Sequence, residues 1–391
     1  MNLSKRPPIY ELPSYSLTGD LIGFLRCGLQ YRLNTIGRLP SARPAQAWFG
    51  QYIHGVLEEA YRRYKLAQQT TSNLTDMAIE INSIRDLIKK RLAAQRLFPG
   101  DEDLEQLGDA RAEVAVNELG PLLFPLIHEA EVRITGARLL RKDLIPSQYI
   151  FREAERYEMV GVVDVITHVT LTDPIFRANP LVQAIVKQLT DNPPEQFEVI
   201  IDYKGMRRPP IQSPHKDALS FWEIYAWQTQ TYAHLRGLQE GSLPVIAGVI
   251  IYLNELHPSR EDMKNLQREL AHGQTDIRPL PGGVEEHMIR SWQVDDDPPQ
   301  LPFAFRLQRA LRVLPMTLES IRNSLVRFDE VVAQIETSRG KELTNGQLMR
   351  SWAQNSSDEG TCAACDARTF CPSYRKETTP RLPGIRLRDK L

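Results

Sequence analysis

The chain has 391 residues, of which 42% are hydrophobic and 25% are charged, and its formal net charge is -1. This composition excludes a disordered chain, provides enough apolar material for one large core or two adjoining ones, and creates no global basic field for nucleic acid. The first residues lack the apolar core of a signal peptide, and the longest clean apolar stretch, around Pro244–Leu253, is far shorter than a membrane span, so we expect a cytoplasmic protein.

Apolar periodicity predicts that the first part of the chain is helical. Helices are expected over Gly19–Leu33, Trp48–Ala67, Met77–Leu97, Leu104–Leu119 and Leu122–Gly136. A turn at Pro40–Pro44 should separate the first two. The buried side of the second should carry Trp48, Tyr52, Val56 and Tyr64 or their neighbours.

The pattern then changes to the alternation typical of strands. Strands are expected over Ser147–Arg156, Met159–Leu171, Phe197–Tyr203 and Pro244–Asn254. An insertion at Thr172–Gln196, with its own short helix, separates the second and third strands, and a helix over Lys216–Leu238 precedes the fourth. The remainder should be mostly helical, notably Phe303–Arg339. The predicted core order is therefore helix, three strands, helix, strand, flanked by a helical lobe and a helical tail.

The four cysteines form an unusual set, with one near the start of the chain and three within ten residues near its end: Cys27, Cys362, Cys365 and Cys371. Disulfides are rare in cytosolic proteins, whereas thiolates in C-x2-C-x5-C with a distant fourth partner can bind zinc or an iron-sulfur cluster. Zinc sites more often consist of two C-x2-C pairs, so the spacing favours iron-sulfur over zinc. Unligated thiols are the remaining alternative.

Acidic side chains fall at two informative places on the predicted strands. Asp164 lies inside the second strand between apolar neighbours, and Asp202 and Lys204 lie at the end of the third. A buried carboxylate must be paired, hydrogen-bonded or bound to metal, and two from adjacent strands could share one hard cation such as magnesium or manganese. The Asp-x-Lys motif alone is weak, because Asp262 and Lys264 repeat it on a polar helix.

Two helical pairs are further candidates. His54 has Gly50 and Glu58 one turn to either side, although a lone helix histidine is more often a core or surface residue. Gln228 and Tyr232 are also one turn apart, and their alternative role is a polar-aromatic pair facing the sheet.

Two basic segments could contact a polyanion or be solvated surface. The first contains Lys204, Arg207, Arg208 and Lys216, and the second, the C-terminal tail, contains Arg375, Lys376, Arg381, Arg386, Arg388 and Lys390.

In combination and in this order, these motifs resemble the RecB-like branch of the PD-(D/E)XK nuclease superfamily. The series is Gly50-x3-His54-x3-Glu58, Gly161-x2-Asp164, Asp202-x-Lys204 and Gln228-x3-Tyr232. More narrowly, one early and three late cysteines resemble the members with an iron-sulfur staple, namely AddB-type nuclease domains, eukaryotic replication helicase-nucleases and CRISPR adaptation nucleases. The resemblance covers about Ser14–Tyr374. It differs in that Cys27 is followed by Gly28, where many members have proline, and in the long insertion.

The resemblance implies an α/β fold with a restriction-endonuclease-like αβββαβ core and a mixed central sheet. Region 1–45 would carry the first cluster ligand, 46–140 a helical lobe with the His54 helix, 141–258 the nuclease core sheet, and 259–391 a helical region with the cysteine triplet and basic tail. The four cysteines would hold a structural 4Fe-4S cluster, with zinc as the alternative and redox sensing as a minor role.

The resemblance also implies the roles of individual residues. His54, Asp164, Asp202 and the main-chain carbonyl of Tyr203 would hold a catalytic Mg²⁺ or Mn²⁺. Lys204 would orient or activate the attacking water and offset charge on the phosphate. Gln228 and Tyr232 would line the path of the strand.

The expected function is therefore a metal-dependent DNA nuclease that acts on single strands or DNA ends. No Gly-x4-Gly-Lys-Ser/Thr loop is present, so we expect a separate helicase partner in repair, recombination or anti-phage defence. The alternatives are a non-catalytic DNA-binding scaffold subunit and a zinc-stapled interaction protein.

Overall fold

The computed structural model describes residues 10–39, 45–70, 80–189, 192–211, 221–355, 359–363 and 365–374. The chain divides into two compact units, the first made of residues 1–42, 135–160 and 323–391 and the second of residues 43–134 and 161–322. The expected turn at Pro40–Pro44, the start of the helix expected at Met77, the cation Lys216 and the basic tail from Arg375 lie outside the described residues.

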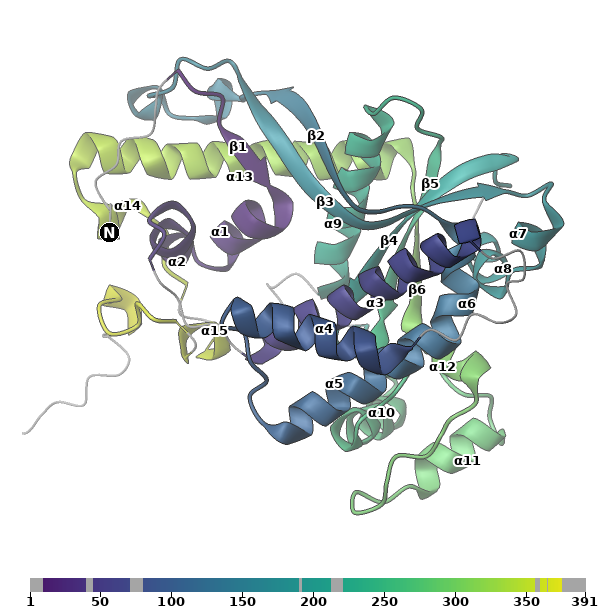
Figure 1. Cartoon of the computed structure of the whole chain (residues 1–391). Coiled ribbons are helices and arrows are strands. Elements are labelled where there is room, and N and C mark those ends of the chain that lie inside the picture. The colour runs from purple at the N-terminus through teal and green to yellow at the C-terminus, as the bar shows by residue number, and fades with distance from the viewer. Residues whose placement is uncertain are drawn as a thin grey trace, which may run out of the picture. The chain divides into compact units, whose positions relative to one another are not determined.

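A mixed sheet forms the centre of the second unit (Figure 1). Its strands are β2 (Ile127–Leu139), β3 (Arg156–Thr170), β4 (Gln196–Lys204), β5 (Val245–Tyr252) and β6 (Leu311–Pro315). Residues 135–139 of β2 and 156–160 of β3 are assigned to the first unit. The strand β3 also pairs with β2 and is antiparallel to β4, β4 is parallel to β5, and β5 is antiparallel to β6. Because parallel strands need a crossover, α9 (Phe221–Gly237) joins β4 to β5.

The central strand β4 shows why this sheet forms. Its residues are buried from Phe197 to Tyr203, as expected for a strand covered on both faces. Asp202 is buried within this apolar run, at 3% exposure. The strand therefore carries two buried carboxylates, Asp202 and Glu198, and Glu198 is paired with Arg236 at 2.7 Å.

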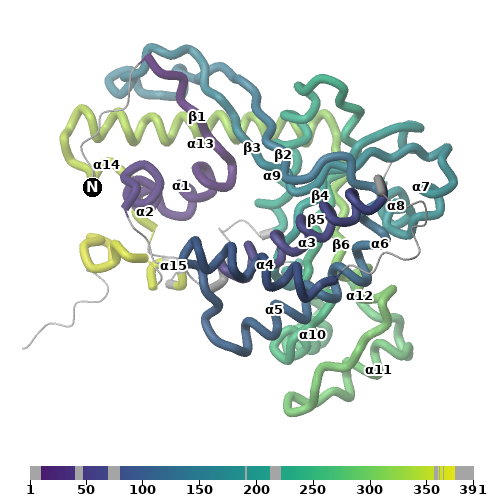
Figure 2. The backbone as a smooth tube through the Cα atoms, viewed as in Figure 1, coloured from purple at the N-terminus to yellow at the C-terminus, as the bar shows by residue number. Residues whose placement is uncertain are grey.

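The helices of the second unit include a packed group of α3 (Ala45–Thr70), α4 (Ile81–Ala94) and α5 (Glu102–Val114), whose backbones follow one another closely in Figure 2. The shorter helices are α6 (Gly120–Leu123), α7 (Pro174–Ala178), α8 (Pro180–Val186), α10 (Arg260–His272), α11 (Val284–Ser291) and α12 (Phe303–Ala310). As predicted, α3 buries Trp48, Tyr52 and Val56, and the first two rings stack at 4.8 Å between centroids.

The predicted order of helix, three strands, helix, strand is present, but the first strand was placed wrongly. Residues 147–155 contain one short 3-10 turn (Ser147–Tyr149) and no strand, whereas the helix expected over Leu122–Gly136 ends at Leu123, passes through a turn at Phe124–Leu126 and continues as β2. Pro125 interrupts the helix. The Glu and Ala residues that follow favour a helix, but pairing with β3 overrides that weak preference.

Phe303–Arg339 is mostly helical, as expected, but β6 separates α12 from α13 (Leu318–Asn345) and pairs with β5 through Leu311–Pro315. One further expectation needs correction. The insertion after β3 holds two short helices rather than one. Each begins with proline, and the side chains of Asp173 and Asn179 accept hydrogen bonds from their first turns.

In the first unit, β1 (Ser14–Ser16) pairs in parallel with Glu158–Val160 of β3. Single turns of π-helix at Leu17–Leu21 and Arg32–Ile36 flank α1 (Ile22–Arg26) and α2 (Gly28–Tyr31). The short helices α14 (Leu348–Ser351) and α15 (Glu359–Ala363) follow α13. The single helix expected over Gly19–Leu33 is therefore interrupted. The break is at Cys27, whose backbone is extended (φ -162°, ψ 109°).

Buried ion pairs hold α13 within the first unit. Arg152 lies 2.6 Å from Glu336, and both side chains are almost fully buried. A buried carboxylate without such a cation would be costly. None of the described helices is long and apolar enough to cross a membrane.

Candidate metal-binding active site

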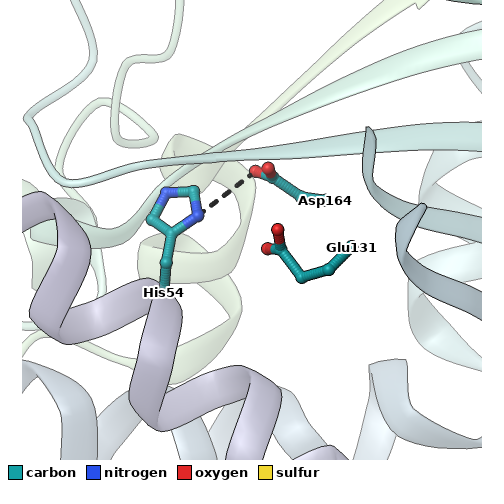
Figure 3. A group of neighbouring side chains, drawn as sticks. All are labelled: His54, Glu131 and Asp164. Atoms are coloured by element: carbon teal, nitrogen blue, oxygen red, sulfur yellow. Dashed lines mark ion pairs between the residues drawn. The ribbon is translucent and has the colours of Figure 1, made fainter. Parts of the chain in front are cut away.

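Three side chains from three elements of the second unit converge on one point: His54 from α3, Glu131 from β2 and Asp164 from β3 (Figure 3). One ligand atom of each lies within 4.8 Å of the others. Within the described ranges, this is the one group of three or more histidine, cysteine or acidic residues with that spacing. Sequence reasoning identified His54 and Asp164 but missed Glu131.

The orientation of His54 follows from its contact with Tyr203. The Nε2 atom of His54 lies 3.0 Å from the main-chain carbonyl oxygen of Tyr203. A carbonyl oxygen only accepts hydrogen bonds, so we assign the imidazole proton to Nε2. The lone pair of Nδ1 is then available on the side of Asp164, whose Oδ2 atom is 3.6 Å away.

Asp164 is held by the adjacent strand. Its Oδ2 atom accepts a hydrogen bond of 2.8 Å from the main-chain N–H of Tyr203. Burial raises the pKa of Asp164, the nearby Asp202 carboxylate adds to this rise, and His54 and Lys204 oppose it. The site therefore disfavours an isolated carboxylate here, and a bound cation would relieve that penalty.

Glu131 occupies an unusual backbone position. It lies within β2, yet its φ is +51°, a left-handed value that costs energy for any residue with a Cβ. Its side chain is exposed by surface area, but enough protein surrounds the carboxyl group to raise its pKa to about 7, with Asp164 adding to the rise. Alternation along β2 could have indicated Glu131, but the segment was interpreted as a helix.

The donor set of one imidazole nitrogen and two carboxylates fits a divalent cation. Carboxylate oxygens suit magnesium and manganese, and the imidazole makes the set better suited to manganese than a purely oxygen set would be. His54, Glu131 and Asp164 are thus able to hold such an ion.

Asp202 and Lys204 form a buried ion pair at the end of β4. The Nζ atom of Lys204 is 2.5 Å from Oδ2 of Asp202. Burial alone would lower the pKa of Lys204, but the carboxylates of Asp202 and Asp164 outweigh it, and the pKa is raised. Lys204 is therefore an ammonium ion, 4.6 Å from the centroid of the Tyr225 ring.

Gln228 holds this ion pair from α9. Its Nε2 atom donates to Oδ1 of Asp202 at 2.9 Å, and its Oε1 atom accepts from Lys204 at 3.4 Å. Gln228 and Tyr232 are buried, with exposures of 4% and 3%. A Cβ at Gly161 would come within 2.5 Å of the Tyr232 ring, which explains the glycine. Both side chains thus lie in the interior of the second unit, on the buried side of the site.

Two of the predicted metal ligands have other partners in the structure. Asp202 contacts Lys204, and the carbonyl of Tyr203 contacts His54. Asp202 does not belong to the three-residue group of His54, Glu131 and Asp164. Their role as ligands stays a prediction.

The cysteines lie in the first unit, and none of the four forms a disulfide. Burial raises the pKa of the Cys365 thiol, and the nearby thiols of Cys27 and Cys371 add to the rise. A backbone hydrogen bond connects an early segment of the chain to a late one near the cysteines. The N–H of Leu29 donates to the carbonyl of Ala353 at 2.9 Å. The four sulfur atoms do not all lie within 4.8 Å of one another.

Two arginines of the basic segment after Asp202 form ion pairs with carboxylates of the same chain. Arg207 lies 2.5 Å from Glu269, and Arg208 lies 2.6 Å from Asp276. Arg208 also donates to two main-chain carbonyls. These arginines are therefore structural, in contrast to the exposed cationic patch that the sequence could indicate.

The mixed sheet, the order of its elements and the histidine-carboxylate cluster are consistent with the core of a metal-dependent nuclease. Residues 19–171 match the family model of the PD-(D/E)XK nuclease superfamily. The matched region contains all three members of the cluster and ends before Asp202 and Lys204. No curated protein sequence matches the chain.

Proposed function

We propose that the protein hydrolyses phosphodiester bonds of DNA with a Mg²⁺ or Mn²⁺ ion held by His54, Glu131 and Asp164. The convergence of these three ligands carries the proposal, because an imidazole and two carboxylates from three separate elements form a donor set that suits a divalent cation. The match to a nuclease superfamily over residues 19–171 supports the choice of reaction.

The chain's own residues supply the remaining requirements of hydrolysis. A divalent cation, when bound, polarises the phosphate and lowers the pKa of water. The ammonium of Lys204 offsets the negative charge that develops on the phosphate and orients the attacking water. Gln228 is a positioning residue, since it fixes both Asp202 and Lys204. Asp202 holds Lys204 and is the proposed additional carboxylate ligand.

The test compares Asp164→Asn with Asp297→Asn, a change at an exposed surface carboxylate. We expect Asp164→Asn to slow cleavage of single-stranded DNA by about 100-fold or more in Mg²⁺ or Mn²⁺, because it removes a charge that holds the cation. Asp297→Asn should cleave as the wild type does. Equal cleavage by the two variants would refute the assigned site and favour the scaffold alternative.

We further propose that Cys27, Cys362, Cys365 and Cys371 hold a structural 4Fe-4S cluster, as in the RecB-like members with an iron-sulfur staple. The residue type and spacing support this proposal, because C-x2-C-x5-C with a distant fourth cysteine can hold such a cluster. Burial raises the pKa of Cys365, and the thiols of Cys27 and Cys371 lie near enough to add to the rise. Thiolate ligation also suits the reducing cytoplasm that we expect for this protein.

Anaerobic purification followed by visible spectroscopy and iron analysis tests the cluster. A brown protein that loses its colour and thermal stability on Cys27→Ser would support it. A colourless protein that contains zinc would replace the cluster with a zinc site.

The proposed substrate is single-stranded DNA or a DNA end, opened by a separate helicase during repair, recombination or anti-phage defence. The absence of a nucleotide-binding loop in the sequence supports a separate motor. Cleavage of duplexes with single-stranded ends, but not of closed circular duplexes, would agree with this proposal. Cleavage of closed duplexes at the same rate would overturn the substrate preference.

A further inference from the structure

A cavity of about 560 Å³ lies beside the metal-ligand cluster, lined by α3 and α4 of the second unit. We propose that this cavity, called here the α3-α4 cavity, binds an unpaired nucleotide next to the scissile phosphate of single-stranded DNA. The inference rests on the proposed nuclease function and adds to it the site that selects an unpaired substrate.

The position of the cavity supports this role. His54 and Glu131 are both lining residues, so a phosphate at the metal ligands would adjoin the cavity directly. The small pocket that His54 and Glu131 share with Asp164 and Tyr203 has room for only about 10 Å³. The nucleotide next to the phosphate therefore has space on the α3-α4 side.

The lining has the chemistry of a nucleotide site. Ile88 and Leu92 of α4 supply an apolar wall, and Arg91 lies between them with its side chain 48% exposed. Arg91 is only loosely held, 3.6 Å from Glu59. A planar guanidinium can stack on a base or bind a phosphate, and an apolar wall can receive the face of any base.

The acidic lining residue Glu58 does not oppose this arrangement. Its carboxylate is 2.5 Å from the guanidinium of Arg62, which compensates its charge. The base and sugar, rather than a second phosphate, are expected to face this side. A cavity of this volume is within the usual range for small ligands.

The size and placement of the cavity select against paired DNA. A base in a duplex is held between its stacked neighbours and must leave the stack before it can enter a separate pocket. An unpaired base in a single strand pays little of that cost. Binding in the α3-α4 cavity would therefore favour single strands without reading the sequence.

Gly50 is the residue that leaves the cavity open. A Cβ built at Gly50 meets no described atom within 4 Å, although Gly50 lies inside α3, where glycine is unfavourable. Gly55, five residues later, has a packing reason, because its Cβ would come within 3.0 Å of Ile88. Gly50 lacks that reason, and a larger side chain there would project into the cavity it lines.

The experiment fills the cavity with Gly50→Phe and uses Gly237→Phe as the matched control. Gly237 ends α9, is exposed and also has open space around its position. Fluorescence anisotropy with a labelled oligothymidylate and with a blunt duplex measures DNA binding, and calorimetry measures Mn²⁺ affinity.

We expect Gly50→Phe to weaken oligothymidylate binding about tenfold, the scale of one lost base-stacking contact, with Mn²⁺ affinity unchanged. Duplex binding should change much less, and Gly237→Phe should match the wild type. A Gly50→Phe protein that keeps its Mn²⁺ affinity and binds the oligonucleotide as the wild type does would overturn the inference. Equal losses for both DNA forms would also overturn it.

Arg91→Gln provides a second test that does not require a large side chain at Gly50. It should raise the KM for single-stranded DNA more than it lowers kcat, whereas Arg290→Gln, at a 77% exposed side chain elsewhere, should change neither. An unchanged KM for Arg91→Gln would contradict the inference. Because binding is measured apart from cleavage, a protein that binds oligothymidylate through the cavity without cutting it would refute the proposed nuclease function alone.

Discussion

The Nε2 atom of His54 lies 3.0 Å from the main-chain carbonyl oxygen of Tyr203, so a hydrogen bond links α3 to the end of β4. The main-chain N–H of the same Tyr203 donates to Asp164. One residue of β4 thus orients two side chains of the cluster. Such contacts around a metal ligand fix its tautomer and direction.

Removal of the imidazole should weaken metal binding. We expect His54→Ala to reduce Mn²⁺ affinity at least about tenfold, since even the loss of a supporting contact has effects of about 10- to 100-fold. His287→Ala, at an exposed position on α11, is the control. Calorimetric titration measures both, and equal affinities would remove His54 from the ligand set.

Replacing Glu131 with glycine should lower activity and raise the stability of the backbone. Because its φ of +51° favours glycine, Glu131→Gly should relieve strain of about 1 kcal/mol while removing a proposed metal ligand. Thermal unfolding without metal should show a midpoint equal to or above that of the wild type, and cleavage should fall. A lower midpoint together with full cleavage would contradict both parts.

The ion pair of Asp202 and Lys204 predicts non-additive stability effects. Lys204→Met leaves a buried carboxylate uncompensated and should lower the free energy of unfolding by about 3–5 kcal/mol. Adding Asp202→Asn should recover much of this loss without restoring cleavage. Urea denaturation measures the free energy of unfolding. Lys142→Met, at an exposed ion pair, is the control, and we expect it to lower the free energy of unfolding by less than about 1 kcal/mol. Additive losses would show that the two residues are not coupled.

Metal binding should depend on pH through Glu131. Its pKa is raised to about 7, so the carboxyl group is mostly protonated below that pH and must release its proton to bind a cation. Mn²⁺ affinity should therefore increase as the pH rises from about 6 to about 8, with proton release near the lower end. Calorimetry in buffers of different ionisation enthalpy measures the release. Glu131→Gln should reduce it, and an unchanged release in that variant would assign the proton to another group.

The strands β3, β4 and β5 and the crossover helix α9 could be predicted from the sequence, because these strands are long and apolar and either alternate or are buried on both faces. The strands β1, β2 and β6 could not. Residues Ser14–Ser16 are too few to give a pattern, and Leu311–Pro315 is preceded by a strong helical pattern. In β2, the local preference for helix was overridden by pairing with β3.

The candidate site shows the same division. Spacing along single elements identified His54, Asp164 and the pair of Asp202 and Lys204, because each stands out against an apolar neighbourhood. Glu131 is missed because its segment has a local preference for helix, whereas its position depends on a left-handed backbone residue and on the pairing of β2 with β3.

The sequence by itself therefore determined which chemical groups are present: one helix histidine, two strand carboxylates, a lysine and four thiols. Only the tertiary structure decided which of them meet. It brought Glu131 to His54 and Asp164, and it paired Asp202 with Lys204. The physical reason is that local periodicity sets which face of an element is buried, whereas the approach of side chains from different elements depends on pairing and packing over long sequence separations.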